Sequence, residues 1–259
     1  MKIPFKKFSG NGNDFVLLDH PQEKLTPALI QKICDRRFGV GADGVLILSS
    51  KEGFDGEMKI FNADGSEAEM CANGLRSLVT YLDSKNTEKK DSYFIKTPNS
   101  QYEVIKEEGR FAIEMSEIKE IGLYDLNLLG GEEKKFYVNT GVPHLVLLQN
   151  EVERINIQKE GSFYRHHEIF PKGTNVNFAE VLDEEKQSIK VRTYERGVED
   201  ETYSCGTGLV ATALAFQTWF GWKGKVHLRT LGGEQVVVLG QKVFYSGEVQ
   251  FCFEGDFLL

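Results

Sequence analysis

Cysteine is scarce in this sequence, and its spacing excludes two common kinds of site. None of the four cysteines belongs to a CxxC pair. The chain therefore has neither a zinc-binding spacing nor the framework of a disulfide-rich domain. We predict free, reduced thiols, no metal site and a cytoplasmic location.

Long apolar runs and an excess of positive charge are also missing. No segment approaches the roughly 20 apolar residues of a membrane helix, and the first residues, MKIPFKKFSGNGNDF, lack the apolar core of a signal peptide. We therefore predict no membrane partner. The 31 Lys and Arg residues against 39 Asp and Glu give a net charge of −8, which argues against a nucleic-acid partner.

The composition is otherwise that of an ordinary globular protein with room for two domains. Of 259 residues, 41% are hydrophobic and 27% are charged. The segment 15–19, FVLLD, is typical of a strand. Residues 25–37 are predicted to form a helix, with Thr26 as its cap and Pro27 at its first position. Turn residues Asp64-Gly65 end a further predicted strand.

The second half of the chain repeats the first. GNGNDFVLLD returns as GVPHLVLLQ, GVGADGVLIL as KGTNVNFAEV, and EMCANGL as YSCGTGL. The offsets are 130, 132 and 134 residues, from Phe15 to Leu145, Gly41 to Gly173 and Cys71 to Cys205. This near-constant spacing predicts two equivalent α/β halves, each with a central helix that starts at its cysteine.

A cysteine at a helix N-terminus lies beside unpaired N–H groups and the positive end of the helix dipole, which stabilise a thiolate. Small residues follow both cysteines, and we expect them to let a ligand carboxylate approach the N–H donors. They are Ala72, Gly74, Gly206 and Gly208. One thiolate and one thiol on opposite faces of a carbon could invert its configuration by removing and returning a proton. We interpret Cys34 and Cys252 as small buried hydrophobes.

Together these motifs resemble the diaminopimelate epimerase family. The resemblance runs through GNGNDFVLLD, FNADGSEAEMCANGLR, GVPH, YERG, SCGTG and SGEVQF, over nearly the whole chain. It implies cofactor-independent conversion of LL- to meso-diaminopimelate, in lysine and peptidoglycan precursor biosynthesis. No pyridoxal-lysine motif stands out. Proline racemases are similar but carry His where Asn73 stands.

The resemblance also implies an architecture. We expect an α+β protein of two pseudo-symmetric α/β domains, each a mostly antiparallel sheet wrapped around a central helix. The active site is expected in the interdomain cleft. The first domain is predicted to cover residues 1–117 and 247–259, and the second residues 118–246. A homodimer is expected.

The resemblance further implies roles for individual residues. Cys71 and Cys205 match the acid/base pair, and His144 and Glu195 match residues that tune the two thiols. The predicted substrate-binding positions are Asn13, Gly44, Asn62, Ala72, Asn73, Asn175, Glu195, Arg196, Gly206 and Thr207. We interpret Asp14 and Asp64, beside these motifs, as turn and capping residues.

Three positions depart from the usual family pattern. Ala72 replaces a glycine, Gly44 a common glutamine and Val142 a common asparagine. With fewer polar anchors, we expect relaxed specificity, including slow racemisation of a smaller acidic amino acid such as glutamate.

Other functions remain open from the residues alone. A proline-racemase-like enzyme would use the same pair of thiols. A cysteine hydrolase could combine one cysteine with His144, a redox switch would use both thiols, and a non-catalytic amino-acid-binding protein would use only the polar set.

Overall fold

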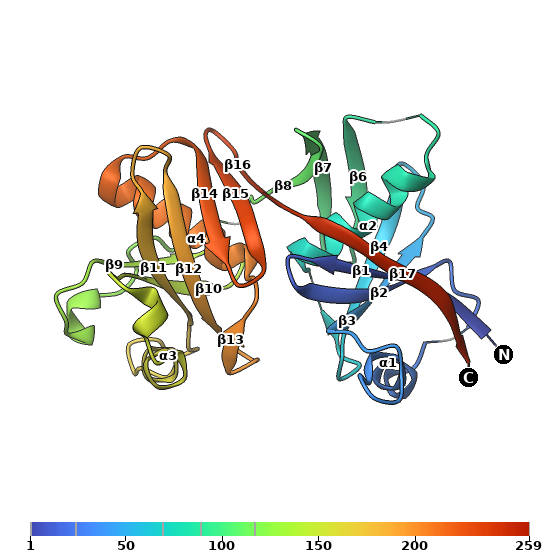
Figure 1. The fold of residues 1–259 in the computed structure, drawn as a ribbon, viewed down its shortest axis with the longest axis horizontal. Helices are drawn as coiled ribbons and strands as arrows, with labels where there is room; N and C mark the ends of the chain where they lie inside the picture. Colours follow the sequence, from blue (N-terminus) through green and yellow to red (C-terminus); the bar gives the residue numbers. More distant parts are fainter. Residues whose placement is uncertain (1, 24, 69, 89, 117, 259) are drawn as a thin grey trace. The chain divides into compact units, whose positions relative to one another are not determined.

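The computed structural model describes residues 2–23, 25–68, 70–88, 90–116 and 118–258. The chain forms two compact units, drawn in Figure 1. The first comprises Met1–Ile113 and Gly247–Leu259, and the second Glu114–Ser246. The sequence predicts the first boundary after residue 117 and the return to the first domain at residue 247.

In its described residues, the first unit contains two helices and a set of mostly antiparallel strands. The helices are α1 (Pro27–Cys34) and α2 (Ala72–Lys85). The strands are β1 (Lys2–Gly10), β2 (Asn13–Asp19), β3 (Gly44–Ser49), β4 (Gly56–Asn62), β5 (Glu67–Ala68), β6 (Ser92–Lys96), β7 (Gln101–Glu107), β8 (Arg110–Glu114), which ends at the boundary, and β17 (Val249–Leu258).

The second unit has the same kinds of element. Its helices are α3 (Ile157–Arg165) and α4 (Gly206–Phe220), with short 3₁₀ turns η1 (Leu126–Leu129) and η2 (Val152–Arg154). Its strands are β9 (Lys135–Asn139), β10 (Pro143–Leu148), β11 (Asn175–Asp183), β12 (Ser188–Glu195), β13 (Asp200–Thr202), β14 (Gly224–Thr230), β15 (Gly233–Leu239) and β16 (Val243–Gly247).

The strand pairing confirms the internal repeat predicted from the sequence. β2 pairs in parallel with β3, and β10 with β11, with α1 and α3 in the respective connections. β3–β4 and β11–β12 are then antiparallel. β4–β6 and β12–β14 are parallel, with α2 and α4 between them in the chain. Each unit is therefore α+β and mostly antiparallel, with the same order of elements.

A central helix packs inside each unit. In Figure 1, α2 lies against β1, β2 and β17, and α4 lies against β9, β10 and β11. Every residue of α4 from Gly208 to Phe216 is buried. A helix that is apolar on all sides must be enclosed by other elements to be stable in water. The sheet of the second unit provides that enclosure, and holds the first turn of α4 in place.

Helix α1 begins where the sequence predicts but ends three residues earlier. Thr26 accepts a hydrogen bond from the Leu29 N–H at 3.3 Å, and Pro27 is the first helical residue. The helix stops after Cys34 because the Asp35 carboxylate accepts the N–H groups of Arg37 and Phe38, both at 2.7 Å. This side-chain turn competes with further helical bonds.

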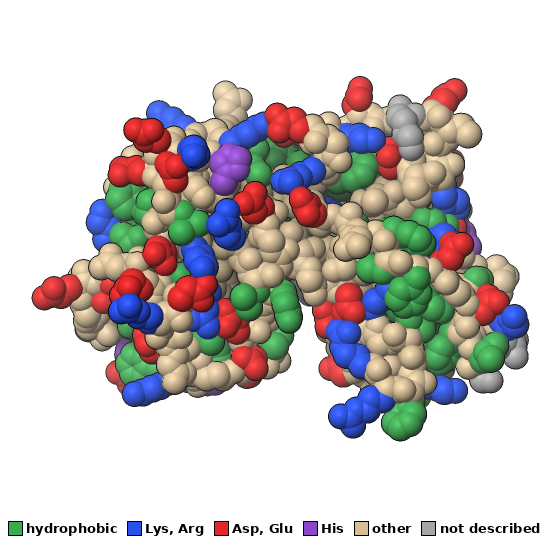
Figure 2. Space-filling view, in the orientation of Figure 1, with side chains coloured by type: hydrophobic (Ala, Val, Ile, Leu, Met, Phe, Trp, Pro, Cys, Tyr) green, Lys and Arg blue, Asp and Glu red, His purple; other side chains and the backbone are tan. Residues whose placement is uncertain are grey.

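Cys34 and Cys252, the two cysteines outside the repeated motif, differ from each other in exposure. Cys34 is buried in α1, and burial raises the pKa of its thiol to about 11. The prediction of a small buried hydrophobe is confirmed there. It is wrong for Cys252, which is exposed on β17. Figure 2 shows hydrophobic side chains on the surface around this strand, and the exposed ones include Phe251 and Phe253.

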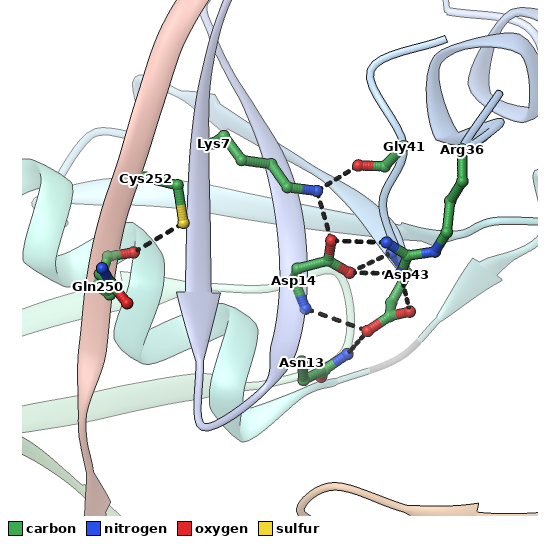
Figure 3. A network of polar contacts seen from close by, with 8 residues as sticks. All are labelled: Lys7, Asn13, Asp14, Arg36, Gly41, Asp43, Gln250 and Cys252. Atoms are coloured by element: carbon green, nitrogen blue, oxygen red, sulfur yellow. Dashed lines mark hydrogen bonds and ion pairs between the residues drawn. The ribbon is translucent and has the colours of Figure 1, made fainter. Parts of the chain in front are cut away.

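A partly buried ion-pair cluster joins β1, β2 and the loop after α1 (Figure 3). The Lys7 ammonium is 2.6 Å from the Asp14 carboxylate and also donates to the Gly41 carbonyl. Arg36 binds the same carboxylate with two N–H groups, at 2.7 and 3.0 Å. Burial alone would raise the pKa of Asp14, but the hydrogen bonds from Arg36 and Lys7 outweigh it and hold this pKa well below its usual range. The turn and capping role predicted for Asp14 is therefore wrong, whereas Asp64 does cap a turn by accepting the Ser66 N–H at 2.8 Å.

Among the described residues, no helix is long and apolar enough to cross a membrane.

Packing of α3 on β12 predicts that Gly161→Ala destabilises the protein. A Cβ at Gly161 would lie 2.6 Å from the Cβ of Tyr194, which is buried. Helix propensity would gain about 1 kcal/mol, but overpacking typically costs about 1–3 kcal/mol. We expect a net loss of roughly 1 kcal/mol in the free energy of unfolding, measured by urea denaturation. Gly240→Ala is the control, because its Cβ would meet its nearest neighbour at an ordinary 3.5 Å; equal stability of both variants would contradict the prediction.

The lowered pKa of Asp14 predicts a pH-dependent contribution to stability. Because its folded pKa lies below the unfolded value of about 3.9, the contribution is present above that pH and is lost as pH falls further. We expect Asp14→Asn to lower the free energy of unfolding at pH 7 by roughly 2 kcal/mol, with the difference from wild type narrowing toward pH 3.

Asp256→Asn provides the matched control for this measurement. Its partner Lys2 lies 3.1 Å away in an exposed pair, so its loss should cost less than about 1 kcal/mol. A difference between wild type and Asp14→Asn that stays constant from pH 7 to pH 3 would show that the charge of Asp14 does not stabilise the fold.

Candidate active site

Cys71 and Cys205 occupy the same position in the two units. Each is the N-cap residue of its central helix, with extended backbone angles of −141° and 118° at Cys71 and −112° and 99° at Cys205. Neither side chain makes a capping hydrogen bond to the first turn. Cys71 is half-buried and Cys205 is 8% exposed. The prediction that both helices start at these cysteines is confirmed.

Both helix starts present backbone N–H donors. The first helical bonds run from Leu75 N to the Cys71 carbonyl and from Leu209 N to the Cys205 carbonyl. The N–H groups before these bonds have no partner within an α-helix. Neither first turn contains an acidic residue, so no side chain of these turns offsets the positive end of the dipole. The two turns have the chemistry of anion sites.

The small residues after each cysteine divide into two groups. A Cβ at Gly208 would lie 2.4 Å from the Asn177 side-chain oxygen, and one at Gly74 would lie 2.9 Å from Leu46. These glycines therefore face the sheet and allow close helix–sheet packing, which differs from the ligand role expected from the sequence. Ala72 and Gly206 are the first residues of their helices.

Cys71 lies beside two of the predicted binding residues, Asn13 and Asn73. The Asn13 Oδ1 atom is 3.6 Å from the Cys71 sulfur and 3.5 Å from the Asn73 Nδ2 atom. Asn13 Nδ2 donates to the Asp43 carboxylate at 2.8 Å, as Figure 3 shows. A carboxylate only accepts hydrogen bonds, so Asp43 fixes the orientation of the Asn13 amide.

Asn73 is oriented from its other side. Buried Arg76 donates to the Asn73 Oδ1 atom at 2.6 Å and to the Asn11 Oδ1 atom at 3.1 Å. The guanidinium only donates, so the Asn73 oxygen must point toward Arg76 and its NH₂ toward Asn13. The sequence prediction missed both Asp43 and Arg76. The available sequence signal was that Asp43 lies within GVGADGVLIL and Arg76 is the last residue of FNADGSEAEMCANGLR.

Cys205 lies beside a different set of groups. Its sulfur is 3.5 Å from the Thr207 hydroxyl, and that hydroxyl is 2.9 Å from His144 Nε2. His144 is fully buried at the start of β10. Burial, and then the charge of Arg196, lower the pKa of His144 to about 3. The imidazole is therefore neutral at physiological pH.

Asn177 completes this group and was not predicted. From β11, its Nδ2 atom donates to His144 Nδ1 at 3.1 Å and to the Leu145 carbonyl at 3.0 Å. Its Oδ1 atom accepts from the Thr193 hydroxyl at 3.0 Å. An asparagine within the otherwise apolar run VNFA was the available sequence signal, because a fully buried amide needs partners.

The remaining residues predicted in the second unit lie at the ends of β11 and β12. The Asn175 amide bridges two backbone groups, donating to the Pro143 carbonyl at 2.9 Å and accepting the Arg196 N–H at 2.8 Å. It thus holds the Arg196 backbone in position. Arg196 donates to the Lys172 carbonyl at 3.1 Å, and Glu195 accepts from the Thr202 hydroxyl at 2.9 Å.

Asn62 and Gly44 lie opposite each other on β4 and β3. Asn62 is exposed, and its Nδ2 atom donates to the Ser66 hydroxyl at 3.0 Å. A Cβ at Gly44 would lie only 2.5 Å from the Phe61 carbonyl oxygen. The backbone here therefore requires glycine, and the glutamine common at this position would need the strands to shift.

Within the part of the chain that the structure describes, no group of three or more His, Cys, Asp or Glu side chains is placed to hold a metal ion.

Solved structures with the same fold cover nearly the whole chain. A PhzF-family phenazine biosynthesis protein from Bacillus anthracis has a TM-score of 0.78 with 16% identity, covering 100% of both chains. A hydroxyproline epimerase from Agrobacterium vitis has a TM-score of 0.66 with 14% identity, covering 98% of this chain and 90% of its own. At these identities the likeness shows the fold alone.

Sequence relatives are closer. The profile of the family described as diaminopimelate epimerase matches residues 5–119 and 136–252. The protein named diaminopimelate epimerase of Methanocella arvoryzae is 38% identical over 98% of this chain and 96% of its own length. Its counterpart in Flavobacterium psychrophilum is 35% identical over 96% and 97%. The chain belongs to the diaminopimelate epimerase family.

Proposed function

We propose that this protein is an isomerase that epimerises LL-diaminopimelate to meso-diaminopimelate without a cofactor, using Cys71 and Cys205 as base and acid. The observation that carries the proposal is the matched pair of cysteines, each at the N-cap of a central helix in a repeated unit. Membership of the diaminopimelate epimerase family supports the substrate class. The proposed pathway role is in lysine and peptidoglycan precursor biosynthesis.

The proposed reaction moves one proton off the α-carbon and another onto it. One cysteine thiolate takes the α-proton, so that the C–H bond breaks and an S–H bond forms. The other cysteine then gives its thiol proton to the opposite face of the carbanion, and becomes the thiolate. The mechanism requires the two sulfurs to reach opposite faces of one α-carbon.

The two helix starts support the charge that this reaction develops. As the α-proton leaves, negative charge moves onto the substrate carboxylate. Backbone N–H groups of the first turns of α2 and α4 can stabilise it, as oxyanion donors do in other enzymes. Arg196 suits a second carboxylate and Glu195 an ammonium group, which together fit a substrate with two amino-acid ends.

The proposed specificity is broader than is usual in the family. Val142 and Gly44 remove two polar side chains that many members carry, and Ala72 adds a methyl group beside the Cys71 thiol. We propose that this leaves a weakly discriminating pocket in which glutamate is racemised slowly. A homodimer and a cytoplasmic location remain predictions.

Both cysteines are required if the two-base proposal is correct. We expect Cys71→Ala and Cys205→Ala each to abolish epimerisation, with a loss of at least about 10³-fold in kcat. The measurement is incorporation of solvent deuterium at the α-carbon of diaminopimelate, together with the ratio of the two epimers. Cys34→Ala, in α1, is the control and should keep normal activity.

Each rival function predicts a different result in that experiment. A hydrolase needs only one of the two cysteines, and a binding protein or redox switch exchanges no α-hydrogen. Normal epimerisation by either single variant would overturn the two-base mechanism. Turnover of proline in place of diaminopimelate would favour the proline-racemase-like alternative.

Relaxed specificity predicts measurable turnover of glutamate. We expect kcat/KM for glutamate to be roughly 10²- to 10⁴-fold below that for diaminopimelate, because the distal contacts are lost and each charged hydrogen bond contributes about 1.5–3 kcal/mol. Val142→Asn should increase the preference for diaminopimelate over glutamate, as the ratio of the two kcat/KM values, by about tenfold, because it restores one polar contact. No racemisation of glutamate or aspartate at high enzyme concentration would show that the idea is wrong.

A further inference from the structure

The hydrogen-bond chain that ends at Cys205 has a defined direction. The Leu145 carbonyl can only accept, so the Asn177 NH₂ group must face it, and the Thr193 hydroxyl donates to the opposite oxygen. The same NH₂ group then donates to His144 Nδ1 at 3.1 Å. Nδ1 therefore carries no hydrogen.

This direction continues through the imidazole. Neutral His144 has one ring hydrogen, and since Nδ1 is an acceptor, that hydrogen is on Nε2. Nε2 donates to the Thr207 oxygen at 2.9 Å. The hydroxyl hydrogen of Thr207 is then directed to the Cys205 sulfur at 3.5 Å. Such a donor stabilises a thiolate relative to a thiol.

The chain that ends at Cys71 has the opposite direction. Asp43 takes the NH₂ group of Asn13, so Asn13 presents its oxygen to the Cys71 sulfur at 3.6 Å. Arg76 turns the Asn73 NH₂ group toward the same oxygen. An amide oxygen accepts a hydrogen bond from a thiol but repels a thiolate. Cys71 therefore faces an acceptor where Cys205 faces a donor.

We propose that Asn177 and Asp43 are positioning residues that give the two cysteines opposite protonation in the resting enzyme, with Cys205 as the thiolate and Cys71 as the thiol. This inference rests on the proposed function, in which the two cysteines act as base and acid. It assigns the first proton abstraction by the resting enzyme to Cys205. The sequence motifs alone do not distinguish the two cysteines in this respect.

Charged groups on the neighbouring elements also surround the two hydrogen-bond chains. Arg196 is the charged group that acts on His144, and Glu195 precedes it at the end of β12. On the Cys71 side, Asp43 and Arg76 bond the two amides directly. Arg36 joins Asp43 to Asp14, which also pairs with Lys7.

The test is the pH dependence of alkylation of each cysteine in the substrate-free enzyme. Iodoacetamide is applied from pH 5 to pH 10, and mass spectrometry quantifies the modified Cys71 and Cys205 peptides. The pH midpoint reports the thiolate, whereas the difference in exposure changes only the maximal rate. We expect the Cys205 midpoint to lie at least about one pH unit below that of Cys71. Cys71→Ala and Cys205→Ala should preserve that order when each remaining thiol is titrated alone; equal or reversed midpoints would overturn the inference.

Threonine variants test the hydrogen-bond chain that ends at Cys205. Thr207→Val removes the hydroxyl and should slow Cys205 alkylation at pH 7 by about tenfold, with Cys71 unchanged, and Thr207→Ser should restore it. Thr212→Val is the matched control, since this buried α4 hydroxyl donates to the Gly208 carbonyl at 2.8 Å. An equal effect of the control would mean that the loss is structural, which would overturn the role of Thr207.

Nitrogen NMR of the histidine ring tests the role of Asn177 directly. In the wild-type protein we expect His144 to be protonated on Nε2 and bare on Nδ1, and hydrogen on Nδ1 would overturn the inference. Asn177→Leu should raise the Cys205 midpoint, and Asp43→Asn should lower that of Cys71. The wild-type midpoints and NMR signals need no variant to fold and no substrate. An active epimerase with reversed midpoints would contradict this inference alone, whereas loss of the proposed function would appear only in the deuterium assay.

Discussion

The first turn of a helix contains N–H groups that the helix itself cannot bond, and each unit of this protein is arranged around one such turn. A cysteine caps it, and its first turn contains no acidic residue. Helix α4 can be apolar on nearly all sides only because the sheet encloses it. Gly74 and Gly208 allow that enclosure to be close, since a Cβ at either would meet a side chain within 3 Å. Packing therefore determines where the donors and the sulfur lie.

The two units share a backbone plan but differ in the polar groups around each cysteine. Strand pairing and helix positions repeat, from β2–α1–β3 to β10–α3–β11. The residue two positions after the cysteine is Asn73 in one unit and Thr207 in the other. The acceptor beside Cys71 is an amide oxygen, and the group beside Cys205 is a hydroxyl bonded to buried His144. Under the proposed mechanism, the acid and the base need such unlike surroundings, and a duplicated fold can provide them by changing side chains alone.

Side chains that hydrogen-bond to the predicted site residues fix the orientation of those residues. Asp43 holds Asn13, and Asn177 holds His144. Near the starts of β2 and β3, Arg36 pairs with both Asp43 and Asp14, and Asp14 also pairs with Lys7. These ion pairs support the contact of Asp43 with Asn13. These groups lie on β1, β2, β11 and the loop after α1. Local pattern predicted a turn role for Asp14, because nothing nearby in the chain reveals a partly buried carboxylate between two cations.

The sequence by itself determined the repeat, the helix starts at Cys71 and Cys205 and the family, because those features are encoded in local spacing, capping residues and motifs. Tertiary structure alone decided which amide faces which partner, that His144 is buried and neutral, and that Cys252 is exposed. It also decided that Gly44 leaves no space for a side chain. Hydrogen-bond direction and burial arise between strands distant in sequence, so no local pattern contains them.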